Sequence, residues 1–234
     1  MKTLFRIKKE TPPSIELQFI ENDLNRWKLT LPTGKPGSPT EIFAPQLLTY
    51  SDSNVIRNET MITLKCPTTG VTTSSTAYPR CELREMNGPA LANWDGRKGS
   101  HQFTFTGSID VLPTAKPQLV FGQIHNDKDD VIELRVTKND KTCIYEVIHN
   151  TTHFGNISAD YVLGSDITVT IMVSGGNVTI SSGETKLVIP QKKLPQLKGS
   201  YFKLGSYVQS NPAHGDGEGQ YGQTTIKATS IKHF

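Results

Sequence analysis

The sequence predicts an all-β fold, an antiparallel two-sheet β-sandwich of the jelly-roll type with a minor N-terminal helix. Three observations support this prediction. Many short segments alternate between apolar and polar residues, and turn residues separate them at short intervals. No internal repeat and no linker divides the chain. Its 234 residues, of which 35% are hydrophobic, suffice for the core of one β-domain.

The N-terminal part of the chain departs from the β pattern. Residues 14–26 fit one short helix, because Ser14 can act as its N-cap and apolar residues follow near helical spacing. We therefore treat residues 1–26 as an N-terminal extension with a short helix. Residues 27–234 are expected to form a single domain.

From residue 27 onward the chain is a series of predicted strands. The first should stop at Pro32, because proline cannot donate a hydrogen bond to a neighbouring strand. The segment Ser174-Gly-Gly-Asn177 predicts a hairpin turn between two alternating runs. The predicted strands are 27–31, 61–65, 78–85, 102–106 continuing as 108–112, 119–125, 131–137, 142–148, 166–173, 178–180, 186–189, 201–209 and 224–231.

The charge and the apolar runs exclude two classes of partner. A net charge of +3 is too small to predict nucleic-acid binding. No apolar run is long enough to span a membrane. Residues 1–9 carry positive charge but no apolar stretch of signal-peptide length, so either the chain stays in its cell or its leader was removed. We expect a monomer that binds neither nucleic acid nor a membrane.

The sequence also lacks the spacing of a metal site. Cys66, Cys81 and Cys143 include no CxxC pair, and their odd number leaves at least one free thiol. Cys81 is expected to be a small buried residue. The acidic residues within 126–130 lack the glycine and the final glutamate of a calcium loop, which favours a solvated turn.

Three predicted strands each carry chemically reactive side chains on one face, because side chains alternate with period two along a strand. The polar faces are Arg80, Glu82 and Arg84 in the first segment, Gln123 and His125 in the second, and Tyr201, Lys203, Tyr207 and Gln209 in the third. The residues expected behind them are Cys81 and Leu83, then Val120 and Ile124, then Phe202, Leu204 and Val208. Groups that bind an anion and move protons are typical of an enzyme rather than of an ordinary solvated face.

These groups match the needs of elimination from a polymer of uronic acids, in which the C5 proton lies next to a carboxylate. Arg80 can bind the carboxylate with two hydrogen bonds. Gln123 and a protonated or donor-tautomer His125 can share the developing charge. Tyr207 and His125 are candidates for the acid and the base. We expect Arg80 and Lys203 to lower the pKa of Tyr207.

The three segments resemble the signature motifs of the alginate lyases of polysaccharide lyase family 7. Arg80-Cys-Glu-Leu-Arg84, Gln123-Ile-His125 and Tyr201-Phe-Lys-Leu-Gly-Ser-Tyr-Val-Gln209 are similar to R-S/T-E-L-R, Q-I/V-H and Y-F-K-A-G-x-Y-x-Q, in the same order. Trp27 to Pro32 resembles the opening strand of the family, so the resemblance runs from Trp27 to the C-terminus. The departures, Cys81 and Leu204, are both expected to face inward.

The resemblance implies a jelly roll with a concave groove that cleaves alginate, an anionic polysaccharide, by metal-independent β-elimination without a cofactor. Its products would be oligosaccharides with an unsaturated uronate at the non-reducing end. Arg80, Gln123 and His125 would neutralise the carboxylate. Tyr207 would be the acid, or acid and base together, and His125 the base for the epimer with the opposite H5. The implied substrate-binding residues are Glu82, Arg84, Tyr201, Lys203 and Gln209. The substrate class implies secretion.

Several alternatives remain open. The same chemistry would serve another polyuronate such as glucuronan, and a jelly roll can also be a non-catalytic carbohydrate-binding module. A glycoside hydrolase would need two carboxylates, and Glu82 is the single acid on the three faces. The glycine-rich segment 210–222 is either a plain surface loop or a mobile lid. Trp94 either stacks on a sugar or holds its own loop in place.

Overall fold

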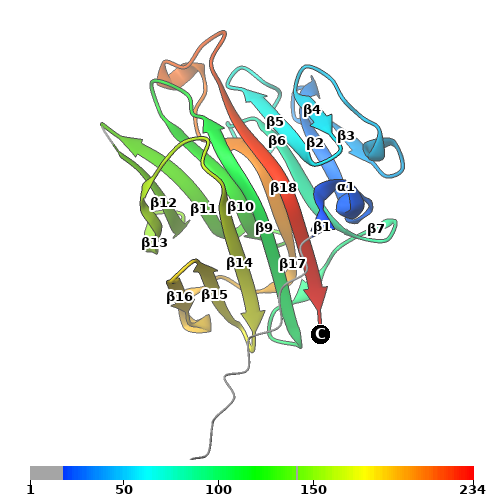
Figure 1. The fold of residues 1–234 in the computed structure, drawn as a ribbon, viewed down its shortest axis with the longest axis vertical. Helices are drawn as coiled ribbons and strands as arrows, with labels where there is room; N and C mark the ends of the chain where they lie inside the picture. Colours follow the sequence, from blue (N-terminus) through cyan, green and yellow to red (C-terminus); the bar gives the residue numbers. More distant parts are fainter. Residues whose placement is uncertain (1–17, 141) are drawn as a thin grey trace, which may run out of the picture.

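The structure, a computed structural model, describes residues 18–140 and 142–234, which form two stacked antiparallel β-sheets (Figure 1). The first sheet has eight strands within the described residues. From one edge to the other it contains β16 (Thr185–Ile189), β15 (Asn177–Ser182), β14 (Ile167–Ser174), β9 (Ser100–Val111), β18 (Tyr221–His233), β5 (Met61–Pro67) and β4 (Val55–Asn58), with β1 (Gln18–Phe19) beside β18.

The second sheet has ten strands in the same described part of the chain. Its order is β13 (Thr152–Tyr161), β12 (Thr142–His149), β11 (Asp130–Asn139), β10 (Gln118–His125), β17 (Lys198–Val208), β6 (Arg80–Asn87), β2 (Trp27–Lys35) and β3 (Ser38–Phe43), with β7 (Ala90–Leu91) beside β6 and β8 (Trp94–Asp95) beside β17. In Figure 1, β10 and β17 pass behind β9 and β18. The predicted two-sheet sandwich is confirmed.

Helical structure is minor, as predicted, but the N-terminal helix is shorter than expected. Of the predicted helix, residues 14–17 lie outside the described residues. The rest comprises β1, α1 (Ile20–Asp23) and a 3₁₀ turn at Leu24–Arg26. Further 3₁₀ turns lie at Gln46–Leu48, Gln191–Lys193 and Pro212–His214. Across residues 18–140 and 142–234, no helix has the length and apolar character needed to cross a membrane.

The strand boundaries differ from the prediction in two respects. β2 does not stop at Pro32 but continues to Lys35, because its pairing with β3 is irregular between Thr30 and Gly34 and needs no donor from the proline. Of the strands longer than two residues, β3, β4 and β13 were not predicted from the sequence. Each lies at or beside a sheet edge, where the alternation of apolar residues is weak.

The core consists of the side chains between the two sheets. Phe103 and Phe105 of β9 meet Phe202 of β17 and Phe121 of β10, with ring centroids 5.1 Å and 5.2 Å apart. All four rings are fully buried. A buried ring of this kind contributes roughly 1.5–3 kcal/mol relative to exposure. Cys81 and Leu83 join the same core, as expected.

A β-bulge in β10 changes which side chains reach the outer face of the second sheet, the face turned away from the core. The pairing of β10 with both β11 and β17 shifts between Val120 and Gly122. Phe121 and Gly122 therefore both face the core. Val120 pairs with Tyr207 and lies on the outer face, so the prediction that it lies behind Gln123 was wrong. The bulge was not visible as a break in the apolar run.

Gly205 brings β17 close to β6. It has φ 151°, and a Cβ atom added to it would lie 2.6 Å from the Cys81 carbonyl oxygen and 2.8 Å from the Glu82 Cα.

We expect Gly205→Ala to lower the free energy of unfolding by roughly 1–3 kcal/mol, because the backbone must move to admit the methyl group. Urea denaturation measures the change. Gly217→Ala is the matched control, since a Cβ at Gly217 meets nothing within 4 Å; equal effects of the two substitutions would contradict the prediction.

Candidate active site

The predicted site residues lie on the outer face of three adjacent strands, β6, β17 and β10, with Gln209 directly after β17, and β11 continues the same face beside β10. Across the sheet, Arg80, Tyr207, Val120 and Arg135 form one row of paired residues. A second row contains Arg84, Lys203, Gln123 and Glu133, and a third contains Tyr201, His125 and Asp130. Three segments far apart in sequence thus form one polar surface, because the antiparallel pairing aligns their alternation.

Glu82 lies beneath this surface and connects its cationic groups. Its carboxylate contacts Lys203 Nζ at 2.5 Å and Arg80 Nη1 at 3.2 Å, and it accepts a hydrogen bond from Gln123. Burial by itself raises the pKa of Glu82, but the charges of Lys203 and Arg80 outweigh it and lower the pKa overall. The side chain is fully buried. The sequence placed Glu82 among the residues lining a groove, whereas in the structure it holds three of its neighbours from below.

Two pockets open on this surface and share Ser75, Arg80 and His125 in their walls. The Lys203 pocket has a volume of about 490 Å³, and its further lining residues include Lys28, Arg84, Tyr201 and Lys203. The Glu133 pocket has a volume of about 460 Å³, and its further lining residues include Thr76, Gln123, Glu133, Tyr207 and Gln209. We call the two pockets together the groove. Arg80 and His125 lie at their junction.

His125 is a neutral imidazole at pH 7. Burial lowers its pKa to about 4, and the charges of Lys203 and Arg80 act in the same direction. The Nδ1 atom lies 2.6 Å from the Asn126 carbonyl oxygen, which can only accept, so Nδ1 carries the hydrogen. This leaves Nε2 as the basic nitrogen. Tyr201 stacks on the ring, with centroids 5.3 Å apart.

Tyr207 keeps its phenolic proton at pH 7. Burial raises its pKa above the ordinary value, although Arg80 and a hydrogen bond with Thr76 oppose the change. The hydroxyl lies 2.9 Å from Thr76 Oγ1, and the Arg80 guanidinium lies 3.9 Å from the ring centroid. The expectation that nearby cations lower this pKa overall was therefore wrong. The effect of burial is larger than that of the cation.

Several buried donors on this surface have no protein partner. Among the buried side-chain atoms of the described residues, Arg80 Nε, Arg84 Nε and Gln209 Nε2 make no hydrogen bond. An unpaired buried donor costs free energy, so such atoms are rare unless a ligand satisfies them. Burial lowers the pKa of Lys203 to about 8, and the charge of Arg80 acts in the same direction. At pH 7 this side chain is still mainly a cation. The surface therefore presents cations and free donors to an anionic ligand.

Sequence reasoning missed Glu133 and Arg135 of β11, as well as Thr76 from the loop before β6. The signal for the first two was available, since the predicted strand 131–137 turns Ile132, Leu134 and Val136 inward and so turns both charged residues outward. Thr76 left no such signal, because its contact with Tyr207 spans 131 residues of sequence and depends on the loop conformation.

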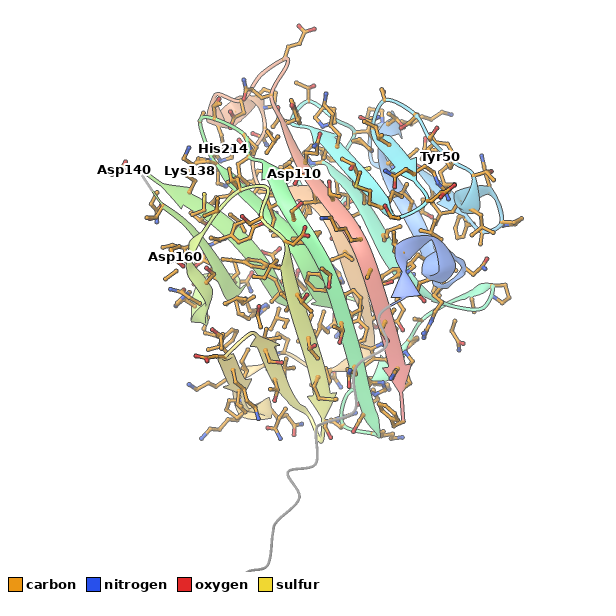
Figure 2. The ribbon with its side chains drawn as sticks, in the orientation of Figure 1. Tyr50, Asp110, Lys138, Asp140, Asp160 and His214 are labelled. Carbon is orange, nitrogen blue, oxygen red and sulfur yellow. The ribbon has the colours of Figure 1, made fainter. Side chains whose placement is uncertain are left out.

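The loop after β17 is tied to the rest of the fold, which does not favour a mobile lid. Asp216 is fully buried and accepts hydrogen bonds from the backbone of Thr114, Ala115 and Lys116 at 2.8–3.0 Å. The loop lies at one end of the sandwich, where Figure 2 labels His214. The His214 ring contacts Tyr78, with centroids 5.7 Å apart. The loop thereby supports the segment that holds Thr76.

Trp94 holds its own loop in place. Its Nε1 donates to Glu85 Oε2 at 3.0 Å, and its ring stacks on His101 with centroids 4.3 Å apart. The other Glu85 oxygen lies 2.7 Å from His233 Nε2. Glu85 also accepts a hydrogen bond from the backbone of Phe202, between Tyr201 and Lys203. The tryptophan is 9% exposed and does not line the groove.

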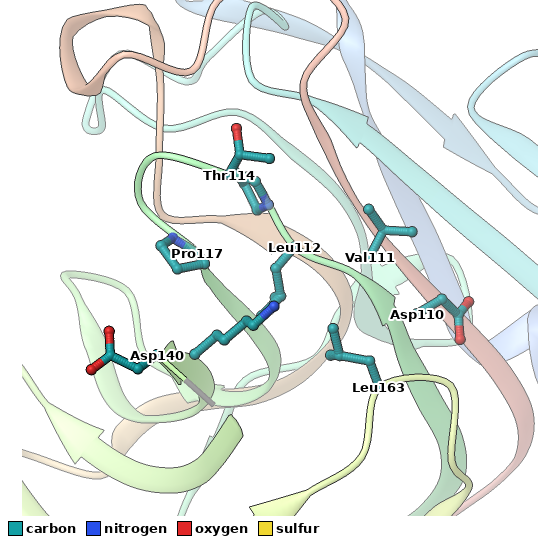
Figure 3. Close-up of a pocket in the computed structure, with 9 residues that line it drawn as sticks. Asp110, Val111, Leu112, Thr114, Pro117, Asp140 and Leu163 are labelled. Carbon is teal, nitrogen blue, oxygen red and sulfur yellow. The ribbon is translucent and has the colours of Figure 1, made fainter. Parts of the chain in front are cut away.

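A third pocket, of about 410 Å³, lies away from the groove at the end of β9 (Figure 3). Of its two acidic residues, Asp110 and Asp140, the first already accepts hydrogen bonds from Ser108, Gln223 and Thr225. Leu112, Leu163 and Lys138 are among its other lining residues. This pocket contains none of the predicted site residues, and its chemistry points to no reaction. In the described part of the chain, no group of three or more His, Cys, Asp or Glu side chains could hold a metal ion.

Comparisons with known proteins give a consistent result. The Alginate_lyase2 family model, described as alginate lyase, matches residues 22–233. The search of curated proteins finds no match to this sequence. Among solved structures, the chain is similar to alginate lyase AlgAT5 from polysaccharide lyase family 7, with 36% sequence identity and a TM-score of 0.82 over 91% of this chain and 96% of that chain.

Two further solved structures have the same fold. An alginate lyase from Corynebacterium sp. is 32% identical, with a TM-score of 0.80 over 91% of this chain and 96% of that chain. A double variant of the family 7 alginate lyase A1-II′ in complex with substrate (GGMG) is 25% identical, with a TM-score of 0.75 over 90% of this chain and 94% of that chain.

Glu133 supplies a test of the electrostatics of the site. Burial raises its pKa to about 8, and Asp130 acts in the same direction. Between the unfolded pKa of roughly 4.3 and this value, the native state binds more protons than the unfolded state. The contribution of Glu133 to stability therefore falls as pH rises. Glutamine cannot ionise, so we expect Glu133→Gln to remove this loss. The free energy of unfolding of the variant should then rise relative to that of the wild type by up to about 1.4 kcal/mol per pH unit.

Urea denaturation at several pH values between about 5 and 8 measures this difference. Glu184→Gln, at an exposed turn position, is the matched control and should show no such trend. A constant difference between Glu133→Gln and the wild type would mean that Glu133 is ionised throughout.

Proposed function

The chain belongs to the Alginate_lyase2 family of alginate lyases, and on this premise we propose that it cleaves alginate by β-elimination in the groove. The observation that carries the proposal is the junction of the two pockets. There a cation, a neutral imidazole and a protonated phenol lie around one space. These are the groups needed to neutralise a carboxylate, remove the adjacent proton and protonate a leaving oxygen.

Arg80 is the proposed binding group for the uronate carboxylate. Although burial acts against its charge, Glu82 and Tyr207 raise the pKa of Arg80, so it remains a cation. Its Nε is buried without a protein partner and can donate to a carboxylate oxygen. Gln123 lies in the next row of the sheet and supplies an amide for the charge that develops as the proton leaves. Because Arg80 and Gln123 neutralise the charge, we propose a reaction without metal.

His125 is the proposed base. In the elimination, its Nε2 removes the C5 proton, the C5–H electrons form a C4–C5 double bond, and the C4–O glycosidic bond breaks. A pKa of about 4 means that Nε2 holds a lone pair at neutral pH. The hydrogen bond from Nδ1 to the Asn126 carbonyl holds the ring in this tautomer.

Tyr207 is the proposed acid that protonates the leaving oxygen. Its raised pKa supports this role, because a phenol that keeps its proton can donate it to the departing oxygen. The same shift disfavours a tyrosinate and hence a role for Tyr207 as the base. Thr76 and Arg80 orient the ring and its hydroxyl.

The remaining expectations extend this proposal. The substrate is an anionic polysaccharide, which suits the four cationic residues Lys28, Arg80, Arg84 and Lys203 in the Lys203 pocket. Because such a polymer is too large to enter a cell intact, we propose that the protein acts outside the cell, as a monomer. A carbohydrate-binding module is disfavoured, since Tyr201 and Tyr207 are 9% and 8% exposed and form no open aromatic platform.

Incubation of the protein with alginate, without added metal, is expected to raise the ultraviolet absorbance of an unsaturated uronate. Parallel assays on polymannuronate, polyguluronate and glucuronan identify the polymer that is cleaved. EDTA should not change the rate. Absence of signal on all four polymers would overturn the lyase proposal, and strong inhibition by EDTA would overturn the metal-free mechanism.

Tyr207→Phe should reduce turnover at least about 100-fold, the contribution typical of a positioned acid, while polymer binding is retained. The substitution keeps the ring over which Arg80 lies. Tyr145→Phe is the matched control, because the Tyr145 hydroxyl is buried in the core without a partner and its loss should leave the rate unchanged. If Tyr207→Phe keeps substantial activity, another group is the proton donor.

A further inference from the structure

Glu133 lies in the wall of the groove but takes no part in the proposed reaction. It pairs with Gln123 across the β10–β11 ladder. It lines the same pocket as Tyr207, His125 and Arg80. Its side chain is 8% exposed, so most of it is removed from water while part faces the pocket.

The Glu133 carboxyl has no hydrogen-bond donor within the described residues. Arg135, two residues along the same strand, instead donates to Glu146 Oε1 from Nε at 3.2 Å and from Nη2 at 3.0 Å. Arg80 is bound to Glu82. An ionised carboxylate so deeply buried would normally be paired with a cation or with several donors. This carboxyl has neither.

Acidic neighbours further disfavour its ionised form. The charged and titratable groups around it are Asp130 and Arg135 of β11, Arg80 and Glu82 of β6, His125 of β10, Lys203 and Tyr207 of β17, Glu146 and His149 of β12, and Lys128 and Asp129 of the preceding loop. Most of the cations in this set are already paired with an acid. Burial and Asp130 raise the pKa of Glu133 to about 8, although the charges of Arg135 and Arg80 oppose the change.

We propose that Glu133 is a substrate-binding residue, which as an un-ionised carboxylic acid donates a hydrogen bond to an oxygen of the uronate in the Glu133 pocket. The inference rests on the proposed function and adds a substrate contact to it. An acid that keeps its proton can contact an anionic sugar closely, whereas a carboxylate at the same place would repel it. The protonated state of Glu133 is thus a condition for binding a polyuronate in this pocket.

Two consequences follow from linkage between proton and substrate. Binding of a polyuronate near pH 8 must be accompanied by uptake of a proton at Glu133. Substrate affinity must also fall as pH rises through the pKa of this group. Lys203, with a pKa of about 8, contributes to the same alkaline loss. A variant at position 133 is therefore needed to separate the two residues.

The kinetic experiment compares the wild type with Glu133→Gln, which keeps a donor but cannot ionise, and with Glu133→Leu, which has no donor. For a group of pKa about 8, the ratio of wild-type KM to Glu133→Gln KM should rise roughly tenfold between about pH 7 and pH 9. Glu133→Leu should raise KM more than Glu133→Gln does at low pH. Glu184→Gln should follow the wild type throughout. Thermal unfolding verifies that each variant folds.

A binding experiment tests the inference independently of turnover. Calorimetric titration with a uronate oligosaccharide, in two buffers of different ionisation enthalpy, counts the protons taken up by proteins that carry Tyr207→Phe. Near pH 8, adding Glu133→Gln should reduce the uptake by roughly half a proton.

The outcomes are distinct. The same pH dependence of KM and the same proton uptake with and without Glu133→Gln would overturn the inference while the lyase proposal stands. If the wild type neither cleaves nor binds any of the four polymers, both the inference about Glu133 and the lyase proposal are overturned.

Discussion

The buried ionic group around Glu82 is the interaction on which the rest of the site depends. A fully buried carboxylate stays ionised here because Arg80 of its own strand and Lys203 of the neighbouring strand both contact it. In return it fixes the positions of both cations and of Gln123. Two cations and one anion leave one positive charge directed at the groove. Removal of one partner from a buried pair costs roughly 3–5 kcal/mol, since the other charge is left uncompensated.

The alternation of polar and apolar residues predicted much of this arrangement from the sequence. Period two placed Arg80, Glu82 and Arg84 together, and the same rule applied to Tyr201, Lys203 and Tyr207. The two-sheet sandwich also followed from it, because each polar face has an apolar face behind it. Such local rules succeed where a strand pairs regularly on both sides. They failed for Val120, where the bulge in β10 inserts Phe121 into the core and changes the alternation.

Electrostatic properties were the part of the site that the sequence could not supply. Proximity to Arg80 suggested a lowered pKa for Tyr207, yet burial dominates and raises it. Whether His125 is protonated depends on how deeply it is buried and on its proximity to Lys203, which belongs to a different strand. The unpaired state of Glu133 depends on Arg135 turning to Glu146 on the next strand. Each of these properties arises from three-dimensional contacts between strands, which single-strand patterns do not contain.

The double pairing of β17, between β10 and β6, has a consequence for how such a groove can evolve. This one strand contributes Tyr201, Lys203 and Tyr207. The close approach of its backbone to β6 at Gly205 sets how far the strand lies from its neighbour. A substitution that shifts the strand would move all of these groups at once, so its central positions have little freedom to vary independently. The loop around Thr76 is not paired in the sheet in this way and carries fewer such constraints. Natural divergence in substrate preference, and laboratory selection for it, should accordingly accumulate at the margins of the groove while its floor stays constant.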